Sequence, residues 1–265
     1  RQFGGETVDI CPKVYADGKV LMMYHYSDII YNIMKRIGGI MSNIINIYHG
    51  SEYVIEKPGF GKGKEHNDFG KGFYCTPDVN LAKEWAVSSL KNGYANRYTL
   101  DTEYLRILNL NSSDYSILNW IAVLVEHRVF SLQTPVARRA KQYLIQNFSI
   151  NVNAYDIVIG YRADDSYFDF AEAFINNGIS VEQLAKAMYL GKLGEQIVIK
   201  SKYAFSLIHF EGSEVASSNQ FYAMRKLRNE EANQNYLAML EEESEGLYIQ
   251  DIIRGGIKNN DARIP

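Results

Sequence analysis

Two short segments near the start of the chain carry residue types suited to holding a dinucleotide. They are Tyr48-His49-Gly50-Ser51 and Asp68-Phe69-Gly70-Lys71-Gly72-Phe73-Tyr74. The imidazole of His49 can bond a sugar hydroxyl, while Gly50 leaves its backbone N–H and C=O open to an amide such as that of nicotinamide. The ring of Tyr74 offers a face for a flat heterocycle. The two segments therefore predict a site that grips one ring and one sugar of NAD.

A late glutamate supplies the charge that such a site needs for chemistry. Cleaving the bond between nicotinamide and ribose calls for negative charge near the sugar, which becomes cationic. Glu195 opens an apolar run that extends to Ile199, and a glutamate on an apolar strand needs a partner or a purpose. Adjacent strand residues face opposite sides, so Gln196 is the alternative inward-facing residue. We favour Glu195 as the catalytic carboxylate, by the logic of glycosidases.

The order of these pieces resembles the ADP-ribosyltransferase superfamily, in its poly(ADP-ribose) polymerase and diphtheria-toxin-like class. That class has a His-Gly-Ser/Thr, then a Phe-Gly-Lys-Gly-(aliphatic)-Tyr segment, then a Glu-(Tyr)-Ile-Val strand. The chain looks closer to an uncharacterised bacterial branch of these transferases. The motifs of that branch, found here across residues 44–212, are His49-Gly50-Ser51, the segment 68–74, Ala82-x-x-Trp85-Ala86, Tyr155-Asp156-Ile157-Val158-x-Gly160 and Ala163-Asp164-Asp165.

The resemblance implies NAD as co-substrate, without a metal, and a role for each matching residue. His49 would bind the adenosine ribose, Gly50 the nicotinamide amide, and Glu195 would catalyse. The implied catalytic set is His49, Tyr74 and Glu195, and the implied NAD-binding set is His49, Gly50, Ser51, Gly72, Phe73, Tyr74, Trp85 and Gln196. The chain departs from the polymerases at Ala82, where they have a serine, and at Trp85, where they have a stacking tyrosine.

Several other motifs are poor matches to their families. Gly59 to Lys64 lacks the spacing of a phosphate-binding loop and reads as a flexible lid. Asp68-Phe69-Gly70 has no kinase catalytic loop to accompany it, and no dinucleotide fingerprint for hydride transfer occurs. Asp164-Asp165 suits a helix cap or a metal, with the cap as the default. Arg128 and Arg162 are candidate pyrophosphate contacts.

Composition limits the functional classes. The chain has 265 residues, a formal net charge of -3, and 28 basic against 31 acidic residues, which gives no footprint for nonspecific nucleic-acid binding. Its two cysteines, Cys11 and Cys75, lack metal-ligand spacing and fit a reducing compartment, which predicts a cytoplasmic protein. The apolar stretch Val20 to Ile47 is interrupted by charged residues, which argues against a membrane span.

The order of the predicted elements favours an α+β fold, with the split antiparallel sheets and surrounding helices of the ADP-ribosyltransferases. We expect an N-terminal helical extension at 1–43, a catalytic domain at 44–212 and a C-terminal helical appendage at 213–265. Expected strands include 44–48, one or two within 97–110, 155–161, 195–200 and 205–210. Expected helices begin at Thr76-Pro77, within 111–130, at Thr134-Pro135, within 164–177, and at Ser180, whose pairing with Gln183 indicates a capping box.

The sequence hypothesis is a mono-ADP-ribosyltransferase that releases nicotinamide and modifies a macromolecular acceptor, either protein or nucleic acid. NAD hydrolysis is a side activity to be expected of such a site. A toxin or defence role would add a cognate regulatory partner. The alternative is a catalytically silent module of the same fold that binds NAD, a nucleotide or a protein.

Overall fold

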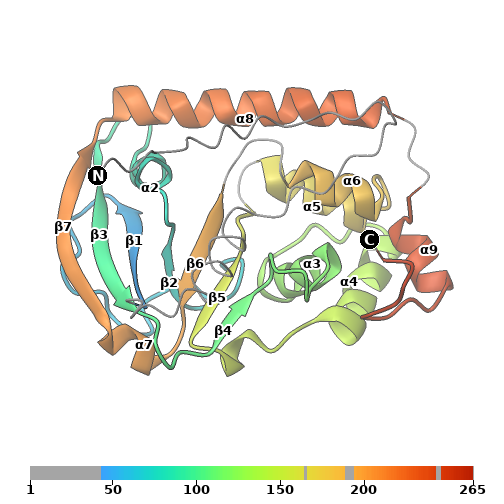
Figure 1. Ribbon diagram of the computed structural model, residues 1–265. Helices are drawn as coiled ribbons and strands as arrows, with labels where there is room; N and C mark the ends of the chain where they lie inside the picture. Colours follow the sequence, from blue (N-terminus) through green and yellow to red (C-terminus); the bar gives the residue numbers. More distant parts are fainter. Residues whose placement is uncertain (1–42, 164–165, 189–193, 243–245, 265) are drawn as a thin grey trace, which may run out of the picture. The chain divides into compact units, whose positions relative to one another are not determined.

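The computed structural model describes residues 43–163, 166–188, 194–242 and 246–264. The expected N-terminal extension, Cys11, and the pair Asp164-Asp165 lie outside these residues. Residues 43–265 form one compact unit. The described chain is an α+β protein with two separate sheets and helices around them (Figure 1), as the order of predicted elements indicated.

The first sheet is antiparallel and contains the first predicted strand. Its strand order is β1 (Ile44–Ser51), β3 (Gly93–Asp101) and β7 (Ile208–Ala216). Isoleucine, tyrosine and threonine are frequent in these segments, as expected of strands that are partly buried. Strand β1 pairs with β3 so that His49 lies opposite Asn96 and Gly50 opposite Ala95. The register thus places His49 and Gly50, both within β1, against the middle of β3.

The second sheet carries the other sequence motifs. Its order is β2 (Phe73–Cys75), β6 (Glu195–Ile199), β5 (Ile157–Tyr161) and β4 (Ile107–Asn109). Pairing is antiparallel between β2 and β6 and between β6 and β5, but β4 pairs with β5 in parallel. Two of the three strand pairs of this sheet are therefore antiparallel as expected, and the β4–β5 pair is the exception.

A bridge of two backbone hydrogen bonds joins the sheets at their edges. The N–H of Tyr48 donates to the carbonyl of Thr76 at 2.8 Å, and the N–H of Thr76 donates back at 2.9 Å. A small core lies between the sheets and includes Ile47, Cys75 and Tyr98, all fully buried. Bridge and core together bring the end of β1 beside the end of β2, where the two motif segments meet.

Helices cover the remaining sides of the sheets. They are α2 (Val79–Ala86), α3 (Ile117–His127), α4 (Pro135–Phe148), α5 (Ser166–Ile175), α6 (Val181–Ala187), α7 (Lys202–Ser206), α8 (Ser218–Leu240) and α9 (Ile249–Arg254), with a 3₁₀ turn at Val152–Ala154. The larger core lies among α3, α4, α5 and α6 and against the second sheet, with Trp120 and Leu124 fully buried. The apolar residues of α3 are buried almost without interruption, which marks it as the central helix of this core.

Two of the predicted helix starts are confirmed and one is wrong. Thr134 caps α4, since its hydroxyl oxygen accepts from the N–H of Ala137 at 3.0 Å, and Ser180 with Gln183 forms the expected capping box of α6. Helix α2 is instead capped by Asp78, whose carboxylate accepts from the first-turn N–H groups. Thr76 instead pairs with Tyr48 of β1 through the backbone bridge.

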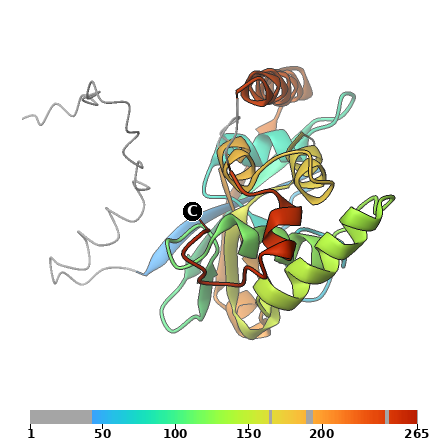
Figure 2. The same cartoon turned by 90° about the vertical axis from the view of Figure 1, so that its right-hand side faces the viewer.

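The last strand and the C-terminal part also differ from expectation. Residues 202–206 form α7, and β7 begins only at Ile208, so the boundary expected at 212 falls inside a strand. Helix α8 contacts α2, α5 and α6 along the top of Figure 1. Figure 2, in which α8 is seen along its axis, shows α9 beside α4, and Ile249 and Ile252 of α9 are fully buried in the larger core. The C-terminal segment is thus packed into the same unit as the sheets.

Candidate active site

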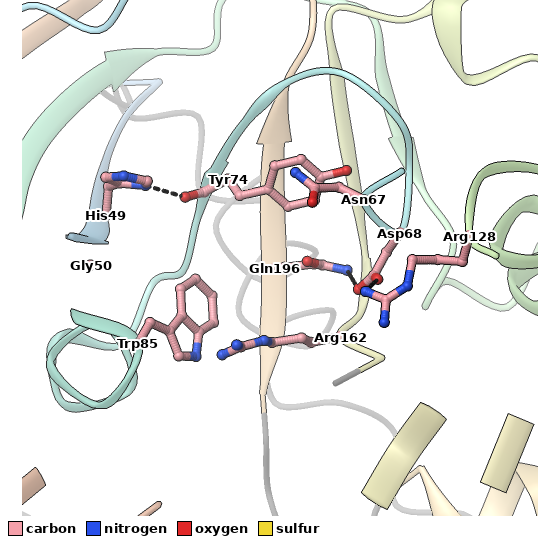
Figure 3. A pocket seen from close by; sticks show the side chains of 9 residues that line it. All are labelled: His49, Gly50, Asn67, Asp68, Tyr74, Trp85, Arg128, Arg162 and Gln196. Carbon is pink, nitrogen blue, oxygen red and sulfur yellow. Dashed lines mark hydrogen bonds and ion pairs between the residues drawn. The ribbon is translucent and has the colours of Figure 1, made fainter. Parts of the chain in front are cut away.

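A cavity of about 220 Å³ opens where the two sheets meet (Figure 3). Residues far apart in the sequence converge on it from β1, β2, α2, β6 and three connecting segments. The lining residues are His49, Gly50, Asn67, Asp68, Tyr74, Trp85, Arg128, Arg162 and Gln196. Five of them, His49, Gly50, Tyr74, Trp85 and Gln196, belong to the binding set expected from the sequence.

His49 is held in one orientation at the end of β1. Its Nδ1 lies 2.7 Å from the carbonyl oxygen of Tyr74, and because a carbonyl can only accept, Nδ1 carries the proton. Burial lowers the pKa of His49 below its usual 6.5, and the hydrogen bond to Tyr74 opposes this only in part. The neutral ring therefore leaves Nε2 as an acceptor, suited to a sugar hydroxyl.

Tyr74 contributes its ring and not its hydroxyl. The hydroxyl donates to the carbonyl of Gly70 at 2.7 Å and accepts from the N–H of Phe69 at 3.0 Å. Burial raises the pKa of Tyr74 well above its usual 10. These contacts tie the glycine-spaced segment into a closed turn, with Gly70 at a positive φ of 72° that favours glycine. Tyr74 therefore offers a stacking face, and its hydroxyl is unsuited to proton transfer.

Glycine at position 50 lets helix α2 rest directly on the sheet. A Cβ on Gly50 would lie 2.0 Å from the carbonyl oxygen of Ala82, and one on Gly93 would lie 2.1 Å from that of Ala86. Ala82 is fully buried at this contact, which accounts for a small apolar residue where the polymerases have a serine. The close approach of α2 to β1 and β3 positions Trp85 in the cavity wall.

The exposed side of Trp85 is partly covered by an arginine. The guanidinium of Arg162 lies 4.2 Å from the centre of the Trp85 ring, a cation–π contact. Figure 3 shows the two side chains side by side at one end of the pocket. Nε1 of Trp85 is buried without a hydrogen-bond partner among the described residues. A ligand reaching this end of the pocket would meet an aromatic edge and a positive charge.

The opposite wall is a buried polar network centred on Asp68. Oδ1 of Asp68 accepts from Nη1 of Arg128 at 3.0 Å, and Oδ2 accepts at 2.9 Å both from the N–H of Ala163 and from Nε2 of Gln196. Asp68 is 5% exposed, so its charge depends on these three donors. The sequence argument missed Asp68, although a charged residue within the glycine-spaced motif was a usable signal.

The structure places Gln196, and not Glu195, in the pocket. Gln196 is 2% exposed, whereas the side chain of Glu195 accepts from Nδ2 of Asn111 at 3.0 Å, away from the cavity lining. The register sets this choice: β6 pairs with β5 so that Gln196 lies opposite Gly160, and neighbouring strand residues face opposite sides. The preference for Glu195 as the residue facing the site is not supported by this geometry.

Three other expected NAD contacts lie behind the cavity and not in its lining. Ser51 accepts from Nδ2 of Asn96 and donates to the carbonyl of Tyr53. Gly72 passes close to β6, since a Cβ there would lie 2.4 Å from Cγ1 of Val198. Phe73 packs against His49, with ring centres 4.5 Å apart. These residues shape and support the site without contacting its interior.

Asn96 anchors the loop between the two motif segments, and nothing in the sequence singled it out. It is fully buried on β3; its Nδ2 contacts the carbonyls of His49 and Tyr53 at 3.2 Å, and its Oδ1 accepts from the N–H of Ile55 at 2.9 Å. Further along the loop, the Phe60 ring packs edge-on against Phe205. The segment just before the expected flexible lid is therefore fastened to the first sheet, and Phe60 of the lid itself packs against α7.

Of the expected pyrophosphate contacts, both Arg128 and Arg162 line the pocket. Two arginines against the single carboxyl group of Asp68 leave the lining with a net positive charge. No group of three or more His, Cys, Asp or Glu residues that could hold a metal ion occurs among the described residues. In the same part of the chain, no helix is long and apolar enough to cross a membrane.

Residues 45–210 match a family model described as "Protein of unknown function (DUF3990)". No curated protein and no solved structure matches the chain. The matched range begins at the second residue of β1, ends inside β7, and contains every residue that lines the pocket.

Proposed function

The chain belongs to the DUF3990 family, and we propose that it is an NAD-dependent mono-ADP-ribosyltransferase. The observation that carries the proposal is the convergence of His49, Gly50, Tyr74 and Trp85 on one cavity with two arginines. The resemblance to the ADP-ribosyltransferases assigns NAD contacts to the first four. Because these residues come from separate elements around the two sheets and line one cavity, they support a single binding site for a dinucleotide.

The chemistry of the pocket suits the nicotinamide half of NAD. The cavity of about 220 Å³ is smaller than a typical ligand pocket of roughly 300–1,000 Å³, so it would take a ring and its ribose while the rest of the dinucleotide lies outside. Tyr74 supplies a stacking face, and Nε2 of His49 accepts from a sugar hydroxyl. The positive charge of Arg128 and Arg162 complements a pyrophosphate.

In the proposed reaction the bond between the ribose C1 and the nicotinamide nitrogen breaks. Its electron pair stays on the nitrogen, which neutralises the nicotinamide ring, and the ribose becomes cationic. A nucleophile of the acceptor then bonds to C1 and loses a proton to solvent or to a nearby base. Water in place of the acceptor gives NAD hydrolysis. Acceptors in either a protein or a nucleic acid satisfy this scheme.

One observation favours a second candidate, a catalytically silent NAD-binding module. The residue that β6 presents to the pocket is the neutral amide of Gln196, while the carboxylate of Glu195 bonds to Asn111. An amide oxygen stabilises a cationic sugar less than a full negative charge does. Binding without turnover would follow.

The test measures binding and turnover on the same samples. Calorimetry with NAD reports binding, and chromatography of released nicotinamide reports cleavage. Wild type is compared with Gln196→Ala and with Gln183→Ala, a buried glutamine in the cap of α6. We expect binding and release in wild type and in Gln183→Ala, with both reduced in Gln196→Ala. Binding without release supports the silent module, and absence of NAD binding to wild type overturns both candidates.

The acceptor and the biological role need a separate experiment. Cell extract is incubated with the protein and isotopically labelled NAD. Mass spectrometry of the products then identifies the modified macromolecule. A toxin or defence effector in the cytoplasm would also arrest growth on expression, and a cognate regulatory partner would relieve the arrest. Growth unaffected by expression, despite nicotinamide release in vitro, would instead favour a housekeeping modification.

A further inference from the structure

We infer that Asp68 is a positioning residue that fixes the side-chain amide of Gln196, so that the pocket presents Oε1 as a hydrogen-bond acceptor to a ligand hydroxyl. This deepens the proposed function and rests on it in one respect, since it assigns the hydroxyl to the ribose next to nicotinamide. The orientation of the amide itself is a property of the protein alone.

The orientation follows from the chemistry of the two neighbours. Nε2 of Gln196 lies 2.9 Å from Oδ2 of Asp68 and 2.9 Å from the carbonyl oxygen of Tyr161. Both neighbours are acceptors, so only the nitrogen end of the amide can face them. Its two hydrogens are then both used, and Oε1 is the free end. Figure 3 shows this oxygen directed away from Asp68, toward the side of the pocket that holds Tyr74 and His49.

The three donors around Asp68 use both of its side-chain oxygens as acceptors. Arg128 donates to Oδ1, and the N–H of Ala163 and Nε2 of Gln196 both donate to Oδ2. An alanine at this position removes the acceptor of all three donors. Gln196 then loses one of the two contacts that orient it, and Arg128 and the N–H of Ala163 lose theirs as well.

The result is a fixed acceptor, Oε1 of Gln196, in the same pocket as Nε2 of His49, which the resemblance assigns to the other ribose of NAD. An acceptor recognises a hydroxyl donor, and the 2′-hydroxyl of the nicotinamide ribose supplies one for Oε1. We therefore expect the site to discriminate against a nucleotide whose nicotinamide ribose lacks the 2′-hydroxyl, because Oε1 would then be desolvated without a partner.

The first experiment reads the amide without any ligand. NMR of the full chain records hydrogen exchange of the Gln196 side-chain NH₂, assigned by its disappearance in Gln196→Met. We expect slow exchange in wild type and fast exchange in Asp68→Ala. The matched control is Asp156→Ala, which removes another buried carboxylate, 6% exposed and paired with Arg106, outside the pocket. Slow exchange that persists in folded Asp68→Ala overturns the inference.

The second experiment measures ligand preference by calorimetry with NAD and with its 2′-deoxy analogue on the nicotinamide ribose. We expect wild type and Asp156→Ala to prefer NAD by roughly tenfold, the value of about one hydrogen bond, and Asp68→Ala and Gln196→Met to lose this preference. If Asp68→Ala does not fold, Gln196→Met still tests the acceptor, because an equal preference for NAD in this variant and in wild type overturns the assignment. Failure of wild type to bind NAD overturns the proposed function, while the exchange experiment still judges the role of Asp68.

Discussion

The two walls of the pocket are built by different kinds of contact. On the side of the first sheet, α2 lies directly against β1 and β3, and glycines at 50 and 93 leave no space for a side chain between them. On the side of the second sheet, Asp68 joins Arg128 and Gln196 through charge-assisted hydrogen bonds in a buried network. The first wall is fixed by shape and the second by electrostatics.

This difference predicts how each wall responds to change. Close backbone packing tolerates no added volume but is insensitive to pH and salt. A buried ion network tolerates changes of volume more easily but depends on every partner, because each deletion leaves a charge or a dipole unsatisfied. Substitutions and pH can therefore separate the contributions of the two walls.

The largest effect is expected at the first wall, from Gly50→Ala. A Cβ at 2.0 Å from the carbonyl oxygen of Ala82 must displace α2, at a cost of about 3 kcal/mol in the free energy of unfolding. The displacement moves Trp85 as well, so NAD affinity should fall in the molecules that remain folded. Urea unfolding and calorimetry measure the two effects. In the control Gly59→Ala, the added Cβ meets only the flexible side chain of Lys62. Equal stability of the two variants would mean that α2 does not rest on Gly50.

The second prediction addresses the polar wall through Arg128→Gln. Removing the guanidinium leaves Asp68 buried with two neutral donors, which should lower the free energy of unfolding by about 2 kcal/mol. The matched control is Arg106→Gln. Its side chain is 68% exposed in the pair with Asp156, so we expect a loss of less than about 1 kcal/mol. Urea unfolding at neutral pH compares the two. Similar losses would show that burial of the Asp68 pair adds nothing to its strength.

The third prediction uses pH to act on the acceptor from the first sheet. Burial lowers the pKa of His49 below 6.5, so the neutral ring is favoured in the folded protein. Its contribution to stability is present above pH 6.5 and is lost as the pH falls through the lowered pKa. NAD affinity should fall over the same range, because protonated Nε2 can no longer accept. NMR titration of the His49 ring and calorimetry between pH 5 and 8 test this. An imidazole that titrates above 6.5 would contradict it.

The sequence could predict the features that depend on local chemistry. The hydroxyl of Thr134 before Pro135 and the pair of Ser180 with Gln183 specify helix starts within four residues, and both occur as predicted. The start at Thr76 fails because that residue bonds across to Tyr48, a contact between segments that no local pattern reports. The short helix at 202–206 was missed for a similar reason, since it lies between two strands of different sheets.

The pocket shows the same limit at the level of single residues. His49, Gly50 and Tyr74 could be proposed from the sequence because each lies within a short contiguous motif. Asp68 and Arg128 are 60 positions apart, and Gln196 is 128 positions from Asp68, so the polar wall exists only after folding. Whether Glu195 or Gln196 faces inward depends on the register of β6 with β5, and a shift of one residue would exchange them.

The smallest effect is therefore expected from Glu195→Gln, the substitution that the sequence argument alone would rank as the most damaging. The new amide keeps an oxygen for Nδ2 of Asn111, so stability should change by less than about 0.5 kcal/mol. With Gln196 occupying the pocket, NAD affinity and nicotinamide release should stay close to wild type. A fall in release of a hundredfold with unchanged affinity would mean that the glutamate reaches the reacting sugar. The register of β6 would then have to differ when NAD is bound, and the polar wall would be the part of the pocket that moves.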